Sequence, residues 1–354
     1  MEGLAMTNIS ERRQEIVGEM VGEGMPRFWC PPLTHYTAGG AVDQDRMAAH
    51  WRFMAPHVNA FLVPGSTGDA WEMQDAEVRA VVDLALKLAG EMGARLLLGA
   101  LKEDAPATRR GIEELLATLK MKTGEDDPIR AMKASNVCGF VVCPPRGSTL
   151  SQEEMGAGLE SVFDLGLPTA LYQLPEMTDN EMSASLVARL TDRYANLILF
   201  KDSSGDDRVA LGADGPRGLF LTRGAEGGYA QWLHETGGPY DGLLLSTANC
   251  FPGELREVIN LLEGGKVAEA TALSDRLTQA IEQVFVLVGG IPDGNPFANA
   301  NKAMDHYRAF GAGARSISPP RLHAGIVIPE EVILKTGDVL ESLDLIPERG
   351  YLDR

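Results

Sequence analysis

The sequence NLILFKDSSGD at residues 196–206 joins a short apolar run to a single cation. A continuous apolar run of this length is typical of a strand that is buried on both faces, as in a parallel sheet. The run ends at Lys201, and a turn-forming SSGD follows directly. Burial at such a strand end would lower the pKa of a lysine and favour attack of its amine on a carbonyl. On this stretch alone, a strand-end lysine that simply extends into water is the more common interpretation.

Seven further apolar runs predict strands along the same part of the chain. They occupy residues 27–33, 60–64, 95–101, 138–144, 168–175, 218–223 and 241–246. Helical spacing of apolar residues predicts helices over residues 43–56, 75–92, 107–120, 152–165, 183–194, 229–235 and 254–262. Eight strands that alternate with these helices predict an α/β fold, a parallel (β/α)8 TIM barrel.

The two ends of the chain differ from this alternating part. Residues 1–24 are polar and helix-like, and residues 263–354 carry only helical patterns, near residues 266–287, 299–310 and 330–343. We therefore expect an N-terminal arm over residues 1–24, a catalytic barrel over residues 25–262 and a C-terminal helical region over residues 263–354. The polar run at residues 123–128 is expected to be an inserted loop.

The composition narrows the classes of partner. The 354 residues carry a formal net charge of −18, with 44% hydrophobic and 23% charged residues. These fractions are ordinary for a globular protein, and the negative charge disfavours nucleic acid and anionic membranes as partners. The chain has neither an apolar run of ~20 residues nor an apolar signal core at its start, so we expect a cytoplasmic protein without a membrane partner.

Metal-binding patterns are not apparent. Cys30, Cys138, Cys143 and Cys250 lie in or beside apolar runs, without the paired spacing of a zinc site. We expect reduced, mostly buried thiols. The six histidines form no ligand motif, and we expect neither a bound metal nor a cofactor.

Three predicted strand ends carry side chains or turns of chemical interest. Lys201 ends the sixth strand, Tyr172 lies near the end of the fifth, and the turn Gly65-Ser66-Thr67-Gly68-Asp69 follows the second. Catalytic groups of TIM barrels lie at the carboxyl ends of the strands, so these three features are expected at one rim.

Four motifs in order then identify a resemblance. Gly65-Ser66-Thr67-Gly68-Asp69, Tyr172-Gln173-Leu174-Pro175, Lys201-Asp202 and Ser246-Thr247-Ala248-Asn249 resemble the dihydrodipicolinate synthase / N-acetylneuraminate lyase family. This is a family of class I, Schiff-base-forming, pyruvate-dependent aldolases. The resemblance covers roughly residues 25–331, and Asn295-Pro296 with Lys302 is similar to the family's C-terminal helical region. Each motif alone is weak, but four in order at strand ends are specific.

The resemblance implies a role for each matching residue. Lys201 would form an imine with the keto carbon of pyruvate or another 2-keto acid, Tyr172 would shuttle protons and Ser66 would relay them. The backbone N–H groups of Ser66 and Thr67, after Gly65, would hold the substrate carboxylate. Four softer candidates match positions that contact the hydroxyl-bearing part of the substrate in the sialic acid lyase branch, and ordinary loop roles are equally open for them. These are Ser203, Gly224, Glu226 and Ser246.

Two departures from the family pattern bear on the second substrate. The synthase branch carries an arginine where this chain has Met177, and its tyrosine pair after the fourth strand is replaced by Cys143-Pro144-Pro145-Arg146. Arg146 is a candidate for binding an anionic tail, with plain exposure as the alternative. His35 is a candidate for tuning specificity, with a structural histidine as the more common interpretation.

The leading hypothesis is a lyase that cleaves or forms a carbon–carbon bond of a 2-keto-3-deoxy sugar acid, with pyruvate and an aldehyde as the small-molecule partners. A sugar-acid dehydratase and a dihydrodipicolinate synthase-like condensation are alternatives that keep the imine. A non-catalytic paralogue that binds a keto acid is a third. The resemblance also implies a homo-oligomer, either a dimer or a tetramer.

Overall fold

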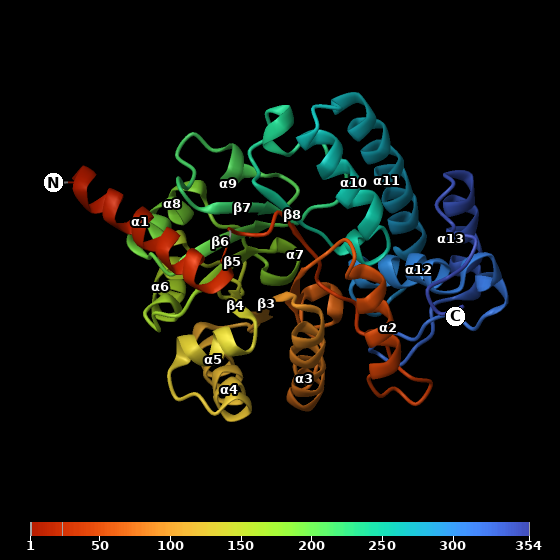
Figure 1. The fold of residues 1–354 in the computed structure, drawn as a ribbon, viewed down its shortest axis with the longest axis horizontal. Coiled ribbons are helices and arrows are strands. Elements are labelled where there is room, and N and C mark those ends of the chain that lie inside the picture. The colour runs from red at the N-terminus through yellow and green to blue at the C-terminus, as the bar shows by residue number, and fades with distance from the viewer. Residues whose placement is uncertain (1, 23, 354) are drawn as a thin grey trace. The chain divides into compact units, whose positions relative to one another are not determined.

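The computed structural model describes residues 2–22 and 24–353, and its elements are labelled in Figure 1. One sheet contains eight strands in the order β1-β8-β7-β6-β5-β4-β3-β2. The strands are β1 (Phe28–Trp29), β2 (Ala60–Val63), β3 (Arg95–Gly99), β4 (Val137–Val142), β5 (Thr169–Gln173), β6 (Leu197–Asp202), β7 (Phe220–Arg223) and β8 (Gly242–Leu244). The predicted (β/α)8 barrel with a C-terminal helical part is confirmed, and the barrel is nearly closed.

Thirteen helices accompany these strands in the described part of the chain. They are α1 (Glu2–Val21), α2 (Gln44–Met54), α3 (Asp75–Met92), α4 (Ala105–Thr123), α5 (Pro128–Ala134), α6 (Gln152–Phe163), α7 (Pro175–Thr178), α8 (Ala184–Arg193), α9 (Arg208–Leu211), α10 (Pro252–Glu263), α11 (Val267–Val288), α12 (Pro296–Phe310) and α13 (Glu330–Ser342). Short 3₁₀ turns are η1 (Ser66–Gly68), η2 (His234–Thr236), η3 (Ser246–Asn249) and η4 (Gly311–Ser316).

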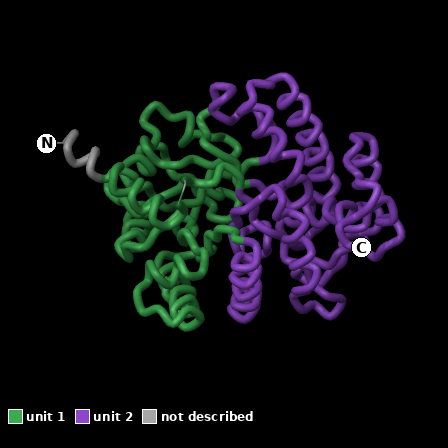
Figure 2. The backbone as a smooth tube through the Cα atoms, in the orientation of Figure 1, with its two compact units in different colours: residues 1–28, 93–225, 238–244 green, residues 29–92, 226–237, 245–354 purple. Residues whose placement is uncertain are grey.

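The chain divides into two compact units, coloured separately in Figure 2. Unit 1 comprises Met1–Phe28, Gly93–Ala225 and Gly238–Leu244, and unit 2 comprises Trp29–Met92, Glu226–Gly237 and Leu245–Arg354. Unit 1 therefore holds strands β3 to β8 with helix α1, and unit 2 holds strand β2 with the C-terminal helices. Each unit is described by itself below.

The core of unit 1 is a set of parallel strands buried along their whole length. Every residue of β4, β5 and β6 is buried, which fits the continuous apolar runs seen in the sequence. The register pairs Tyr172 of β5 with Lys201 of β6, and Lys201 with Thr222 of β7. Residues in register on neighbouring parallel strands point to the same face, so this row is fixed by the sheet itself.

A buried arginine of helix α1 contacts four backbone carbonyl groups of unit 1. The Arg13 side chain is 3% exposed, and its guanidinium donates to the carbonyl oxygens of Leu197 at 2.6 Å, Tyr194 at 3.1 Å and Gly218 at 3.2 Å. It also donates to the carbonyl of Thr191. Burial lowers the pKa of Arg13, which nevertheless retains its charge-assisted hydrogen bonds. The N-terminal helix is therefore fixed to the beginning of the strand that carries Lys201.

Unit 2 is organised around α12, a helix buried on nearly all sides. Its buried positions include charged and amide side chains as well as alanines and Met304. Asn295 caps the helix by accepting from the N–H of Phe297 at 2.8 Å, and Pro296 occupies the first turn, where it needs no N–H partner. A buried helix of this kind must find partners for its polar side chains, and they lie in the loops around it.

One predicted helix is wrong. In the predicted range 229–235, residues 229–232 form turns and the 3₁₀ turn η2 begins at His234. Gly227 and Gly228 adopt φ values of +84° and +62°, in the left-handed region that a right-handed helix cannot use. A second difference follows the predicted loop at residues 123–128. Asp127 caps a helix there, α5, that apolar periodicity did not reveal.

The described residues contain no helix that combines the length and the hydropathy needed to cross a bilayer. All four cysteines are buried and free, as predicted. Within residues 2–22 and 24–353, no group of three or more His, Cys, Asp or Glu side chains is arranged to hold a metal ion.

The anchor at Arg13 generates a stability prediction. Arg13→Ala leaves several buried carbonyl oxygens without a donor, so we expect it to lower the free energy of unfolding by about 2–4 kcal/mol. Urea denaturation followed by far-UV circular dichroism measures this change. Arg12→Ala is the matched control, because Arg12 is exposed on the same helix. Equal stability of the two variants would contradict the anchoring role.

Candidate functional site

The residues singled out from the sequence divide between the two units. Unit 1 contains Tyr172, Lys201, Ser203 and Gly224. Unit 2 contains Gly65, Ser66, Thr67, Glu226 and Ser246. Each group forms a connected set within its own unit.

Lys201 is a buried cation that faces an aromatic ring. It is the fifth residue of β6 and is 4% exposed. Its Nζ lies 4.0 Å from the centroid of the Tyr172 ring, which the neighbouring strand β5 places in register. A cation over the face of a phenol ring is attracted by the ring quadrupole, and this contact orients the amine. The strand pairing therefore brings the predicted nucleophile and the predicted proton shuttle together.

Gly224 provides the space in which the lysine side chain lies. A Cβ atom at this position would lie 2.5 Å from Cε of Lys201 and 2.2 Å from Oγ of Ser203. The backbone N–H of Gly224 donates to the carbonyl of Asp202 at 2.6 Å, which keeps the glycine close to β6. Glycine is required here by close approach, a reason that the sequence alone did not reveal.

The phenol of Tyr172 is buried and hydrogen-bonded. Tyr172 is 3% exposed, and its side chain shares a hydrogen bond with Ser203. Burial raises the pKa of Tyr172 well above its usual value, with only a partial offset from the Ser203 bond. Burial likewise raises the pKa of the Cys143 thiol, against the opposing effect of the Lys201 charge. Both groups are therefore protonated at neutral pH. Cys143 belongs to the surroundings of Lys201, and this was not predicted.

Residues beyond Lys201 are braced by a buried ion pair. Arg223 donates to both carboxylate oxygens of Asp207 at 3.0 Å, and the hydroxyl of Tyr240 donates to the same group at 2.5 Å. Asp202 accepts from the N–H of Ser204 at 2.9 Å through Oδ1, while its Oδ2 is buried without a partner. Burial raises the pKa of Asp202. This bracing network was not predicted, because its members are scattered over residues 202–240.

Arg146 is already engaged by two carboxylates. It donates through Nε to Asp179 at 2.9 Å and through a terminal nitrogen to Glu103 at 3.0 Å, and its side chain is 45% exposed. Because two carboxylates already occupy the guanidinium, Arg146 fits the interpretation as an exposed surface residue better than the interpretation as a binding group for an anionic tail.

In unit 2, the turn at residues 65–69 forms the 3₁₀ turn η1. Ser66 and Thr67 are buried, at 6% and 5% exposure. Their backbone N–H groups donate to no acceptor within residues 2–22 and 24–353, whereas those of Gly68 and Asp69 close the turn onto the carbonyls of Gly65 and Ser66. Two adjacent free N–H groups form the kind of concavity that accepts a carboxylate.

Side chains from α12 and from the loop after β1 hold this turn. The amide of Asn295 donates to Oγ of Ser66 at 2.8 Å, and Nζ of Lys302 lies 2.7 Å from the carboxylate of Asp69. The hydroxyl of Tyr36 donates to the same carboxylate at 3.0 Å. Of these three, Asn295 and Lys302 were noticed only through the family resemblance, and their contacts with the turn were not predicted.

Glu226 is a carboxylate whose acceptor positions are filled. It accepts from the hydroxyls of Ser246 at 2.5 Å, Thr247 at 2.6 Å and Tyr229 at 2.9 Å, and from the N–H of Thr247 at 3.0 Å. Ser246 in turn accepts from the amide of Asn301 at 2.9 Å. The group connects the loop after β7 with η3, and a carboxylate so fully bonded is suited to fixing hydroxyl orientations rather than to removing protons.

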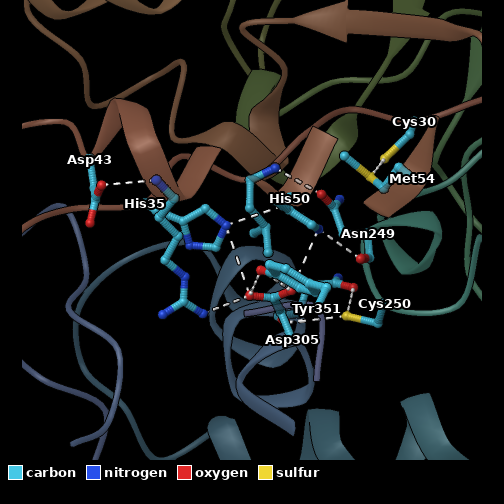
Figure 3. Close-up of polar contacts among 12 residues, drawn as sticks. Cys30, His35, Asp43, His50, Met54, Asn249, Cys250, Asp305 and Tyr351 are labelled. Atoms are coloured by element: carbon cyan, nitrogen blue, oxygen red, sulfur yellow. Dashed lines mark hydrogen bonds and ion pairs between the residues drawn. The ribbon is translucent and has the colours of Figure 1, made fainter. Parts of the chain in front are cut away.

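His35 belongs to a buried network, shown in Figure 3. Its Nε2 lies 3.1 Å from Nδ1 of His50, and Nε2 of His50 lies 2.8 Å from the carbonyl of Asn249. Asp305 accepts from Arg46 at 2.9 Å and from the hydroxyl of Tyr351 at 3.0 Å. Burial lowers the pKa of both histidines, so both are neutral. This arrangement supports the structural interpretation of His35.

Comparison with known proteins gives a consistent family. The model of the dihydrodipicolinate synthetase family matches residues 130–292. The 4-hydroxy-tetrahydrodipicolinate synthase of Agrobacterium fabrum is 26% identical over 265 residues, which cover 73% of this chain and 82% of that protein. A probable 5-dehydro-4-deoxyglucarate dehydratase of Rhizobium rhizogenes is 28% identical over 193 residues, covering 53% of this chain and 55% of that protein.

Solved structures share the fold at lower identity. A prophage protein of E. coli K12 from the dihydrodipicolinic acid synthase family, solved in complex with pyruvate, superposes with a TM-score of 0.70 at 22% identity, covering 91% of this chain and 100% of that one. A Sulfolobus 2-keto-3-deoxygluconate aldolase gives a TM-score of 0.68 at 14% identity, covering 90% of this chain and 96% of that one.

The resemblance indicated by the four sequence motifs is therefore confirmed, and so is the predicted lyase class, since the curated relatives are synthases and a lyase of this kind. The chain is similar to members of the dihydrodipicolinate synthetase family over residues 130–292 and, at 26% identity, over 73% of its length.

Proposed function

We propose that this protein is a pyruvate-dependent class I aldolase that cleaves or forms a carbon–carbon bond of a 2-keto-3-deoxy sugar acid. The observation that carries the proposal is the placement of Lys201, which is buried 4.0 Å from the Tyr172 ring beside a glycine that leaves it room. An amine oriented at the end of a buried strand is prepared for attack on a carbonyl carbon.

The chemistry follows from the imine. The amine of Lys201 adds to the C2 keto carbon, and loss of the C2 oxygen as water gives a protonated imine. When the C3–C4 bond breaks, its electron pair moves into the imine to form an enamine. The C4 hydroxyl loses its proton and becomes the carbonyl of the released aldehyde. Protonation of the enamine at C3 and hydrolysis return pyruvate and the free amine.

Tyr172 is the group assigned to these proton transfers. Because burial keeps the phenol protonated, it is suited to pass on its own proton as it receives another, rather than to hold a negative charge. Because Ser203 is hydrogen-bonded to Tyr172, its hydroxyl is assigned to the same proton transfers. Ser66 is assigned the relay role that the sequence motif implies.

The remaining candidates are assigned to substrate binding. The free N–H groups of Ser66 and Thr67, in the turn begun by Gly65, are suited to the substrate carboxylate. Glu226 orients the Ser246 hydroxyl, and the Ser246 oxygen is the group assigned to the hydroxyls of a sugar acid. Met177 in place of the synthase arginine, together with the paired state of Arg146, favours a neutral hydroxylated partner over an anionic one.

A dehydratase that uses the same imine is the second candidate, favoured by the similarity to the probable dehydratase of Rhizobium rhizogenes. A synthase-like condensation is favoured in the same way by the synthase relatives. Product analysis distinguishes the three, because the lyase releases pyruvate, the dehydratase loses water without cleavage, and the synthase consumes pyruvate.

Borohydride trapping tests the imine directly. Reduction in the presence of pyruvate should add one reduced pyruvate to Lys201, detected by peptide mass spectrometry, because borohydride converts the imine into a stable amine. Lys201→Arg is the control and should take up nothing. An unmodified Lys201 in the wild-type protein would contradict the proposal. If pyruvate is trapped but no sugar acid in a panel is turned over, a non-catalytic keto-acid-binding protein is favoured.

Substitution of Gly224 tests the geometry around the amine. Gly224→Ala forces Cε of Lys201 and Oγ of Ser203 to move, and a displacement of ~1 Å can reduce turnover about 100-fold. We therefore expect kcat/KM for pyruvate release to fall by about that factor. Gly90→Ala is the matched control, since no atom lies within 4 Å of a Cβ at that helical position. Equal rates in the two variants would refute the crowding argument.

Tyr172→Phe separates imine formation from proton transfer. The variant keeps the ring beside Lys201 but removes the phenol proton, so we expect trapping by pyruvate to persist while kcat falls about 10²–10⁴-fold. Steady-state kinetics and borohydride trapping on the same preparation measure both. A kcat within threefold of the wild-type value would remove Tyr172 from the mechanism.

A further inference from the structure

Asn295 makes two different sets of contacts with the two ends of its amide. Its Oδ1 accepts from the backbone N–H groups of Phe297 at 2.8 Å and Ala298 at 3.4 Å, which caps α12. Its Nδ2 donates to Oγ of Ser66 at 2.8 Å. Asn295 is 6% exposed. The cap fixes the orientation of the amide, because only an oxygen can accept from the two N–H groups.

The orientation of the amide determines how Ser66 can use its hydroxyl. A serine hydroxyl has one proton to donate, and its oxygen can accept. Because Asn295 donates to that oxygen, the Ser66 proton is directed away from α12 toward a different acceptor. Capping alone needs only the oxygen of Asn295, so the donation to Ser66 is a separate feature.

The same helix orients a second serine in the same way. Six residues further along, the amide of Asn301 donates to Oγ of Ser246 at 2.9 Å. Ser246 then donates its own proton to Glu226 at 2.5 Å. In this case both the donor and the acceptor of the serine are present in the structure, and the hydroxyl points from α12 toward the loop. Asn295 and Ser66 repeat the first half of this arrangement.

We propose that Asn295 is a positioning residue that sets the direction of the Ser66 hydroxyl for proton transfer in the aldolase reaction. The inference rests on the proposed function, since it needs Ser66 to take part in proton transfer. In this proposal, a residue of the C-terminal helical part of the chain orients a group that transfers a proton. Neither the barrel motifs nor the family resemblance indicated this role.

Asn295→Asp tests the donation without removing the cap. Aspartate is an equally good N-cap, and its charge is favourable at a helix N-terminus. Its carboxylate cannot donate to Ser66, however, and must instead accept the serine proton. We expect kcat at neutral pH to fall about 10–100-fold, on the scale of a lost proton-transfer group. KM, the melting temperature and the borohydride trapping of pyruvate at Lys201 should stay close to their wild-type values.

The pH profile provides a readout that a merely structural role would not change. As the pH falls through the pKa of the introduced carboxyl, the protonated acid regains a donor, so the ratio of variant to wild-type kcat should rise toward acid pH. Asn299→Asp is the matched control. It introduces the same charge on the same helix at a buried amide that donates to the carbonyl of Asp293 at 3.0 Å and does not contact Ser66. Its kcat ratio should not depend on pH in this way.

The outcomes separate the two proposals. If Asn295→Asp keeps kcat within about twofold of the wild-type value at every pH, or if the control shows the same acid-side recovery, the inference about Asn295 is overturned while the aldolase assignment stands. If the wild-type protein neither traps pyruvate at Lys201 nor turns over any sugar acid, the proposed function fails and the inference fails with it. A double variant with Ser66→Ala should show no further loss over Ser66→Ala alone, because both changes act on one hydroxyl.

Discussion

The structure of unit 1 depends on keeping one cation at the end of a buried strand. Taking an ammonium group out of water is costly unless nearby groups compensate for the lost hydration. Lys201 lies against the face of an aromatic ring and runs past a residue without a side chain. The parallel register of β5, β6 and β7 fixes these neighbours, so the position of the amine is a property of the sheet rather than of a flexible loop.

Unit 2 solves a related problem with α12. A helix that is buried on nearly all sides and yet carries Asn301, Lys302 and Asp305 must satisfy each polar side chain from the surrounding loops. Lys302 forms an ion pair with Asp69, and Asn301 donates a hydrogen bond to Ser246. Asp305 accepts hydrogen bonds from Arg46 and Tyr351. These bonds fix the loops relative to the helix. The loops include the turn at residues 65–69 and the Ser246 motif.

The sequence was sufficient for the barrel and for the row formed by Tyr172 and Lys201, because buried parallel strands leave continuous apolar runs and the motifs fall at their ends. It failed at residues 229–235, where apolar spacing suggested a helix but two left-handed glycines precede a set of turns. It could not reveal the partners of Ser66 or Glu226, since Asn295 is 229 residues away from Ser66 along the chain. Contacts of that sequence separation depend on the folded arrangement, and local propensity carries no information about them. Asn295 was noticed only through the resemblance of Asn295-Pro296 to the family's C-terminal helical region, which indicated no contact with Ser66.

The Arg13 contact lies at the start of β6, and the proposed nucleophile lies near the end of the same strand. The guanidinium binds the carbonyl of Leu197, the first residue of the strand, and the amine of the fifth residue is the proposed nucleophile. At ~3.3 Å per residue, roughly 13 Å of rigid backbone joins the two. A shift of the N-terminal helix that displaced the start of β6 would therefore act on the position of the Lys201 amine from a distance.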